Sequence, residues 1–246
     1  MEKLIESGLA QLGLAGQVPA DAPGQLAQFG QLMLEKNRVM NLTAITDPAD
    51  VATLHILDCA ALLNCAGFPG KTLVDVGTGA GFPGVPLKIL VPSLEVTLLD
   101  SLNKRVDWLK EACAALNLDG IAALHCRAEE AGLDPAFREQ FDFATARAVA
   151  DLRVLCELCL PFVKVGGFFL AMKGPDCGGE LEEAQAAIST LGGQVTRQFS
   201  YAIPHTGVTH SVVIIQKLRP TPAKYPRRWA KLQKNPISGK NTGNIG

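Results

Sequence analysis

The chain has 246 residues, a net charge of −1 and 48% apolar residues, which is enough to bury a substantial core in one α/β domain. No stretch approaches the roughly 20 apolar residues of a membrane span, and the first residues lack the basic and apolar segments of a secretion signal. Seven cysteines without framework spacing indicate a reduced, cytoplasmic protein. Cys156 and Cys159 lie in a helical pattern with no second pair for zinc, so we expect buried thiols and no metal.

Two or three helices are predicted in the first part of the chain. Residues from about Gly24 to Arg38 place apolar side chains on one helix face. Asp47 is expected to cap a further helix that begins at Pro48 and continues to about Asn64. We interpret these helices, about residues 1–66, as an extension of a single domain.

Histidines raise the question of acid–base chemistry. His55 and Asp58 lie three residues apart and so share a helix face. No serine or cysteine motif accompanies them, and a structural hydrogen bond between the N-terminal helices and the sheet is an equal alternative. His125 and His210 are single histidines in predicted strands, where core or edge packing is the simpler expectation.

A glycine-rich turn follows an apolar strand between Leu73 and Gly84. The sequence there reads Leu-Val-Asp-Val-Gly-Thr-Gly-Ala-Gly-Phe-Pro-Gly. Glycines at alternate positions let the backbone approach a bulky ligand. Asp75 precedes the first glycine by two residues, where a carboxylate suits the sulfonium and ammonium of S-adenosylmethionine better than the pyrophosphate of a dinucleotide. A glycine-rich turn without a ligand is the simplest alternative.

A second carboxylate ends the next strand, residues 95–99. Asp100 lies 25 residues after Asp75, and an acid about 20 residues beyond a glycine-rich turn can accept hydrogen bonds from ribose hydroxyls. Both aspartates fall at carboxyl ends of strands, where open α/β sheets bind ligands. The pair therefore favours a nucleoside site. A nicotinamide oxidoreductase remains an alternative, because its cofactor also contains ribose.

The rest of the chain alternates strands and helices, with a final pair of strands that can form a hairpin. We expect strands at about 121–125, 141–146, 167–172, 194–201 and 210–217, and helices ending near Asn117, over about 150–161 and around 181–191. This alternation predicts a mostly parallel sheet with helices on both faces.

The C-terminal part of the chain is strongly basic. Eight of the 23 basic residues and none of the 24 acidic ones lie from Lys217 onward, and Tyr225 and Trp229 stand among them. Such a segment suits the phosphates of nucleic acid, with rings that can stack on bases. A solvated tail that aids solubility is the alternative. Residues 238–246 are rich in glycine and asparagine, and we expect them to be disordered.

Several motifs together resemble one family over nearly the whole chain. They are Asn41-Leu42-Thr43-Ala44-Ile45, His55-Ile56-Leu57-Asp58, the run from Asp75 to Gly84, Leu99-Asp100-Ser101, Arg127-Ala128-Glu129-Glu130, Thr145-Ala146-Arg147-Ala148-Val149 and Tyr225-Pro226-Arg227-Arg228. With them the chain resembles the bacterial 16S ribosomal RNA guanine-N7 methyltransferases, also called glucose-inhibited division protein B. The segment beyond Ile237 extends past the usual end of that family.

The resemblance implies a fold and an activity. The fold is a Rossmann-like class I methyltransferase with a seven-stranded, mostly parallel sheet. Its cofactor-binding core spans about residues 70–218 and is followed by a basic tail, about 219–246. The implied activity is methyl transfer from S-adenosylmethionine to N7 of a guanine in the 530 loop of 16S ribosomal RNA. The implied partner is that RNA or the small ribosomal subunit, and nothing indicates a protein partner.

The same resemblance assigns residues to the cofactor and to RNA. The implied cofactor contacts are Gly77, Gly79, Phe82, Asp100, Ala128, Glu129 and Arg147, with Ala128 and Glu129 near the adenine. Arg147 is expected near the cofactor's carboxylate or the RNA, and a surface arginine without a ligand is its alternative. Arg227, Arg228 and Lys231 are expected to bind RNA. No proton-transfer residue is nominated, because guanine N7 has a lone pair and no proton to lose.

Overall fold

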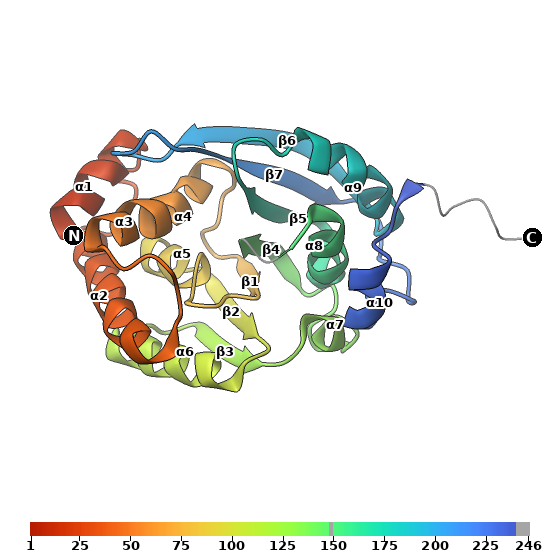
Figure 1. Ribbon diagram of the computed structural model, residues 1–246, viewed down its shortest axis with the longest axis horizontal. Helices are drawn as coiled ribbons and strands as arrows, with labels where there is room; N and C mark the ends of the chain where they lie inside the picture. The colour runs from red at the N-terminus through yellow and green to blue at the C-terminus, as the bar shows by residue number, and fades with distance from the viewer. Residues whose placement is uncertain (148–149, 240–246) are drawn as a thin grey trace, which may run out of the picture.

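A seven-stranded sheet forms the centre of the computed structural model, which describes residues 1–147 and 150–239 (Figure 1). The strands are β1 (Thr72–Val76), β2 (Glu95–Asp100), β3 (Ile121–His125), β4 (Phe141–Arg147), β5 (Val163–Lys173), β6 (Gly193–Ala202) and β7 (Thr209–Lys217), in the order β3-β2-β1-β4-β5-β7-β6. Strands β1 to β5 pair in parallel, and β7 is antiparallel to both β5 and β6. The predicted Rossmann-like fold and the final hairpin are confirmed.

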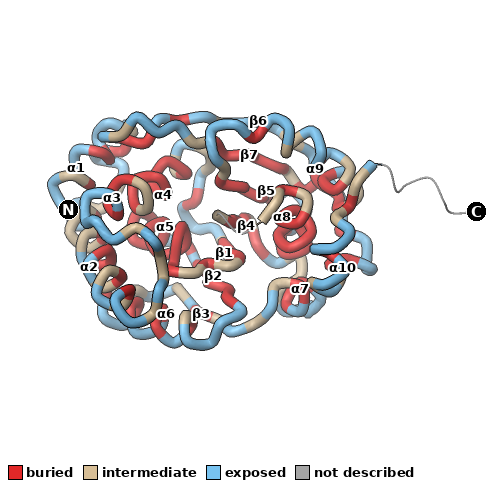
Figure 2. Tube along the Cα trace, viewed as in Figure 1, coloured by how far each residue is buried: buried red, intermediate tan, exposed pale blue. Residues whose placement is uncertain are grey.

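Helices cover both faces of the sheet because successive strand residues point to opposite sides. Leu73 and Leu98 belong to one buried cluster, and their neighbours Val74 and Leu99 belong to the other. The first cluster is completed by α1 (Glu2–Gln11), α2 (Ala22–Met40), α5 (Gly84–Leu90) and α6 (Asn103–Ala115), and the second by α7 (Ala128–Ala131), α8 (Leu152–Cys159), α9 (Gly178–Thr190) and α10 (Trp229–Lys234). Figure 2 shows buried segments through the middle of the molecule and exposed ones around its edge.

The helix predicted from Pro48 to Asn64 is helical throughout but is not one α-helix. It consists of α3 (Pro48–Asp50), a π-helical segment η1 (Val51–Leu57), α4 (Asp58–Ala60) and a 3-10 turn η2 (Ala61–Asn64). Asp47 caps its start as predicted, since its Oδ1 accepts hydrogen bonds from the backbone N–H groups of Ala49 and Asp50. Wider π turns inside helices occur frequently at functional sites, and η1 carries His55.

Strand β5 begins earlier than the sequence predicts, at Val163 instead of about residue 167. The difference arises at a pair of glycines that resembles a strand boundary. Gly166 has a φ of +89°, and the register between β4 and β5 shifts between Phe141 and Phe143. The strand therefore continues through an irregularity that its sequence does not reveal.

The basic C-terminal segment, residues 219–239, is packed against the core. Within it Leu232 is fully buried and Tyr225 is 8% exposed. The guanidinium of Arg138 donates hydrogen bonds to the carbonyl oxygens of Thr221 and Tyr225. The alternative of a solvated tail is thus wrong for this segment. Of residues 238–246, which are expected to be disordered, residues 240–246 lie outside the described residues, and these include the basic Lys240.

The expectation of buried thiols is confirmed. Cys156 and Cys159 are buried free thiols, as predicted. Across residues 1–147 and 150–239, no helix combines the length and apolar character that crossing a membrane requires. The same residues contain no cluster of histidine, cysteine and acidic side chains arranged for a metal ion.

Candidate functional site

Two cavities meet at the carboxyl ends of β1 and β2. One, the Glu129 cavity, has a volume of about 350 Å³, and the other, the Arg147 cavity, about 400 Å³. Gly77, Asp100 and Ser101 line both. All seven residues predicted to bind the cofactor line this double cavity, with Ala128 and Glu129 in the first part, Gly79, Phe82 and Arg147 in the second, and Gly77 and Asp100 at the junction.

The glycine-rich turn forms the floor of the junction. Gly77 and Gly79 have φ angles of +70° and +59°, a region that side chains disfavour. The N–H of Gly77 donates to the carbonyl oxygen of Leu99 over 2.8 Å, which ties the turn to β2. A Cβ atom at Gly79 would find only the carbonyl oxygen of Gly77 within 4 Å, at 3.9 Å. Bare backbone with open space above it therefore faces the cavity.

Asp100 is held rigidly between the two cavities. Its Oδ2 accepts a hydrogen bond from the N–H of Gly79 and its Oδ1 one from the N–H of Leu102, both over 2.9 Å. Arg105 approaches Oδ2 at 3.5 Å. Each carboxylate oxygen has a second lone pair. The side chain can therefore accept two further hydrogen bonds, as from the neighbouring hydroxyls of a ribose.

Asp75 does not face the cavities, so the expectation that it meets the positive charges of a ligand is wrong. Strand alternation directs Val76 to the Glu129 cavity and Asp75 to the opposite face, beneath α5. The fully buried Oδ2 accepts hydrogen bonds from the hydroxyl of Thr78 over 2.6 Å and from the N–H of Gly84 over 2.9 Å. Burial raises the pKa of Asp75 to about 6. This carboxylate shapes the turn by joining its two ends.

Arg147, at the end of β4, is fixed by contacts with the N-terminal helices. Its guanidinium donates to Oδ2 of Asp58 over 3.2 Å, to the carbonyl oxygen of Leu54 over 3.2 Å and to Nδ1 of His55 over 2.9 Å. The guanidinium also lies 5.0 Å from the ring centre of Phe82. Within the part of the chain that the structure describes, these bonds use three of the five N–H groups of the guanidinium. The other two N–H groups can bind a ligand.

His55 is neutral at physiological pH. Burial, together with the charge of Arg147, lowers the pKa of His55 to about 4. Because Nδ1 accepts from Arg147, the proton lies on Nε2, which donates to the hydroxyl of Thr43 over 2.9 Å. The ring also stacks on Phe82, with centroids 4.7 Å apart. Between the two interpretations of His55 and Asp58, these contacts favour a structural link between the N-terminal helices and the sheet.

Asp58 completes this network, and it corrects the expectation for His210. Nδ1 of His210 lies 2.8 Å from Oδ1 of Asp58, so this histidine makes a hydrogen bond to a buried carboxylate rather than simple strand packing, and this bond raises the pKa of His210. Burial would raise the pKa of Asp58, but bonds from His210 and Tyr201 and the charge of Arg147 hold that pKa below its usual value. His125 lies on the edge strand β3, as expected, with Nε2 3.1 Å from the carbonyl oxygen of Ser101.

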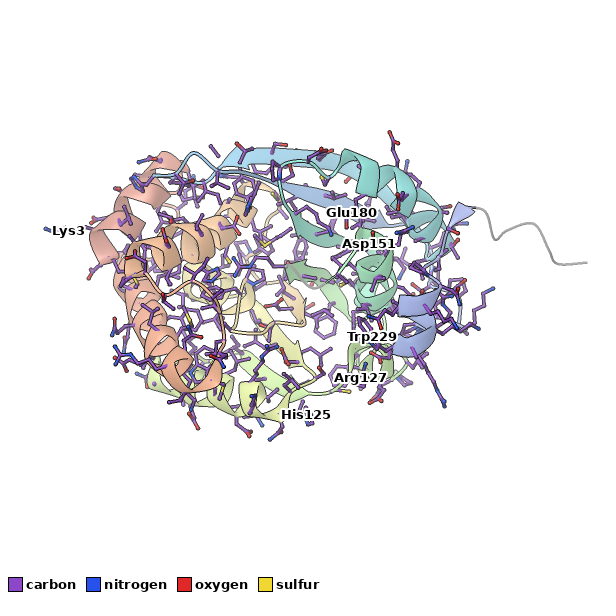
Figure 3. All side chains as sticks on the ribbon, in the orientation of Figure 1. Lys3, His125, Arg127, Asp151, Glu180 and Trp229 are labelled. Atoms are coloured by element: carbon purple, nitrogen blue, oxygen red, sulfur yellow. The ribbon has the colours of Figure 1, made fainter. Side chains whose placement is uncertain are left out.

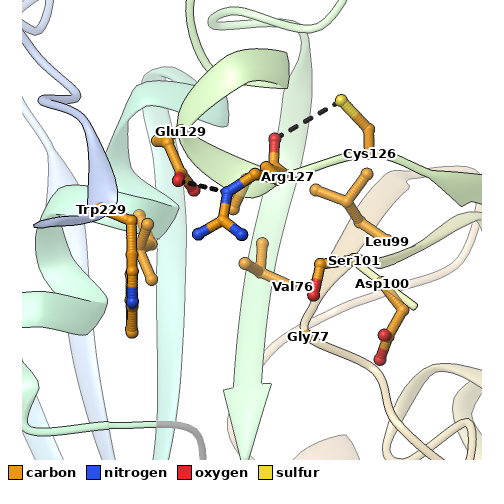
Figure 4. A pocket seen from close by; sticks show the side chains of 11 residues that line it. Val76, Gly77, Leu99, Asp100, Ser101, Cys126, Arg127, Glu129 and Trp229 are labelled. Carbon is orange, nitrogen blue, oxygen red and sulfur yellow. Dashed lines mark hydrogen bonds and ion pairs between the residues drawn. The ribbon is translucent and has the colours of Figure 1, made fainter.

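The Glu129 cavity has a wall that the sequence does not predict. Glu129 accepts a hydrogen bond from Nε of Arg127 over 2.6 Å. Trp229, the first residue of α10, lines the cavity from the side opposite Leu99 and Asp100 (Figure 4). Figure 3 shows Arg127 and Trp229 close together although they come from distant parts of the chain. In the sequence, Trp229 stands out as an aromatic residue in the basic segment. The basic residues around it suggest that its ring stacks on RNA bases, not that it lines this cavity.

The three residues predicted to bind RNA have different surroundings. Arg227 is half-buried and forms a bidentate ion pair with Glu157 of α8, with distances of 2.6 and 2.8 Å. Glu157 also accepts from the backbone N–H of Arg227 over 2.8 Å. Arg228, just before α10, and Lys231, within α10, are both exposed. RNA binding stays a prediction for all three, with the charge of Arg227 already compensated.

Comparison with known proteins identifies relatives along most of the chain. A family profile described as rRNA small subunit methyltransferase G matches residues 23–206. A protein of the name ribosomal RNA small subunit methyltransferase G from Alkaliphilus metalliredigens (strain QYMF) is 46% identical, covering 95% of this chain and 98% of the relative. One of the same name from Symbiobacterium thermophilum is 47% identical, covering 95% and 97%.

Solved structures agree with the fold. TYW2 from M. jannaschii, in complex with AdoMet, superposes with a TM-score of 0.51 over 67% of this chain and 76% of that chain, at 14% identity. At such low identity the similarity shows the Rossmann-like architecture alone.

Proposed function

The chain belongs to the rRNA small subunit methyltransferase G family, and from this premise we propose that it methylates N7 of a guanine in the 530 loop of 16S ribosomal RNA, with S-adenosylmethionine as the methyl donor. The observation that carries the proposal is the double cavity, which joins an apolar part to a cationic part at the fixed carboxylate of Asp100. A nucleoside that carries an amino acid has groups that match these parts in the same order: a base for the apolar part, ribose hydroxyls for Asp100 and a carboxylate for the cationic part.

The residues present fit that donor. The open backbone at Gly79 leaves room that a side chain would fill, and Asp100 is placed for ribose hydroxyls. In the Glu129 cavity, Val76, Leu99 and Leu158 supply apolar walls for a purine ring. In the Arg147 cavity, the two remaining N–H groups of the guanidinium can bind a carboxylate.

The chemistry requires alignment more than proton transfer. When bound, S-adenosylmethionine supplies a methyl group on a positively charged sulfur. Guanine N7 attacks with an in-plane lone pair, so no general base is needed, and the neutral His55 is used to hold Arg147. Positioning two reactants in line can contribute roughly 7 to 11 kcal/mol. The contacts of Arg147 with Asp58, His55 and Phe82 provide such rigidity.

The RNA must present its guanine outside a regular duplex. N7 lies in the deep groove of an RNA helix, which protein side chains reach poorly. An unpaired or distorted loop removes that obstacle. Arg228 and Lys231 are exposed cations that can bind the flanking phosphates, and the substrate is 16S rRNA or the small ribosomal subunit.

Transfer of a labelled methyl group tests the proposal. Small subunits and 16S rRNA from a strain that lacks this protein are incubated with labelled S-adenosylmethionine, and the modified nucleotide is located by cleavage at N7-methylguanine. We expect one modified guanine in the 530 loop. Label at another position, or on protein or small molecules only, would refute the assignment. The Gly79→Val variant, whose side chain would occupy the cavity, is the inactive control.

A further inference from the structure

Trp229 occupies an unusual place for an aromatic residue in a basic segment. It is half-buried and lines the Glu129 cavity beside Leu158 of α8. A second hollow of about 550 Å³ shares Trp229, Arg127 and Glu129 with the first. Trp229 therefore borders two cavities.

Trp229 packs in part against the second buried cluster, and its intermediate burial leaves the rest of its aromatic surface uncovered. A large aromatic ring gains stability when its face is covered, and a planar ring at stacking distance covers it best. Of the two, the Glu129 cavity is the one that also contains Gly77 and Asp100, and it has apolar walls at Val76, Leu99 and Leu158. Glu129 and Arg127 supply its polar groups. A heteroaromatic ring that enters this cavity would meet Trp229 on one side and the end of the sheet on the other (Figure 4).

The position of Trp229 is set by anchors on both sides of it. Two residues earlier, Arg227 forms the bidentate pair with Glu157, whose side chain is 1% exposed. Three residues later, Leu232 is fully buried in the cluster beneath α8 and α9. The carbonyl oxygen of Tyr225 is held by Arg138 over 2.9 Å. These contacts fix the start of α10 against the core, and Trp229 itself is partly buried against the same cluster.

We propose that Trp229 stacks on the adenine of the methyl donor, so that the basic C-terminal segment completes the cofactor site. The inference rests on the proposed function, since it takes the adenine of S-adenosylmethionine as the ring in the Glu129 cavity. It assigns Trp229 to the cofactor instead of to RNA bases. It also makes one segment contribute both a wall of the cofactor site and the exposed cations Arg228 and Lys231.

Tryptophan emission tests the proposal directly, because the chain has two tryptophans. Trp108 is buried in the other cluster against Phe29, with ring centroids 6.2 Å apart. In the Trp108→Phe variant all tryptophan emission comes from Trp229. We expect S-adenosylhomocysteine to change that emission saturably and methionine, which lacks the adenine, to leave it unchanged.

Affinity for S-adenosylhomocysteine, measured by calorimetry, provides the second test. Stacking of a base on an aromatic side chain is lost on substitution by alanine, so Trp229→Ala should weaken binding by about 10- to 100-fold. Trp229→Phe keeps a ring and should retain most of the affinity. Trp108→Phe, the matched change in the core, should bind like the original protein. Circular dichroism and thermal unfolding establish that each variant is folded.

The outcomes separate this inference from the proposed function. If the original protein binds S-adenosylhomocysteine and Trp229→Ala binds it equally well, or if Trp229 emission responds only to an RNA containing the 530 loop, the stacking role is refuted and the proposed function stands. If the original protein binds no S-adenosylhomocysteine, both are refuted. Should Trp229→Ala fail to fold, the emission titration decides, and an emission of Trp229 that S-adenosylhomocysteine leaves unchanged would refute the stacking role.

Discussion

Replacing Glu157 by glutamine should loosen the C-terminal segment while leaving the sheet intact. Glu157 is 1% exposed and binds Arg227 through three hydrogen bonds, two from the guanidinium and one from the backbone N–H. A glutamine can still accept the two bonds that now reach Oε1. Its amide nitrogen would replace Oε2, the acceptor for the Arg227 Nη2–H group, so that two donors would face each other.

The free-energy cost of Glu157→Gln follows from the burial of the ion pair. Removing one partner of a buried ion pair costs about 3 to 5 kcal/mol, because the other charge is left without compensation. The side chain of Arg227 is 17% exposed, and two acceptor contacts remain, so we expect the lower end, about 3 kcal/mol. Since 1.4 kcal/mol corresponds to tenfold, the population of the undocked segment should rise about 100-fold.

Hydrogen exchange measured by mass spectrometry checks this. The amides of Lys231 and Leu232 bond to the carbonyl oxygen of Arg228 and report docking of α10. Peptides that contain them should exchange faster in Glu157→Gln, while peptides from the sheet should not. Glu182→Gln, the same change at an exposed position of α9, is the control. Unchanged exchange at α10, or equal acceleration throughout the protein, would show that the pair does not anchor this segment.

Three further predictions concern the turn, the RNA surface and pH. Gly79→Val should weaken S-adenosylhomocysteine binding more than tenfold, since a side chain at a φ of +59° is strained and would fill the cavity; normal affinity in calorimetry would contradict the site. Changing both Arg228 and Lys231 to glutamate should lower affinity for an RNA containing the 530 loop and flatten its salt dependence, with cofactor affinity unchanged; an unchanged salt slope in filter binding would count against this surface. For Asp75, the rise of its pKa from 3.8 to about 6 corresponds to about 3 kcal/mol. Because the folded state holds a proton that the unfolded chain releases, this part of the stability is present below pH 3.8 and is lost as pH rises through about 6. Urea unfolding across this range should show a decline that Asp75→Asn removes, and parallel pH profiles for the two proteins would refute it.

The ion pair of Arg227 changes how the basic segment should be tested. From the sequence, reversal of the charges of Arg227 and Arg228 together would be expected to affect RNA alone. In the structure a glutamate at position 227 would face Glu157 and displace α10, and Trp229 with it. Deletion of the basic segment would likewise remove a wall of the Glu129 cavity. Exposed Arg228 and Lys231 therefore provide the cleaner test.

The sequence by itself determined the sheet and the edge of it at which the proposed cofactor site lies. Gly77 and Gly79 follow β1, Asp100 ends β2, and Ala128 and Glu129 follow β3. Parallel strands in this order end at the same edge, so motifs that lie at successive strand ends must converge there. The family resemblance refined this convergence to seven residues, and all seven line the double cavity.

Only the tertiary structure decided which side chains enter the site and which support it. Asp75 points beneath α5 because strand alternation gives the cavity to Val76, and no motif spacing reveals which face will be open. Asp58 and His210 lie 152 residues apart in the chain and meet because the N-terminal helices pack against β7. The basic segment is docked by Glu157 and Leu232, which brings Trp229 to the Glu129 cavity. Such contacts depend on how elements far apart in the chain pack together, and local sequence patterns do not predict that packing.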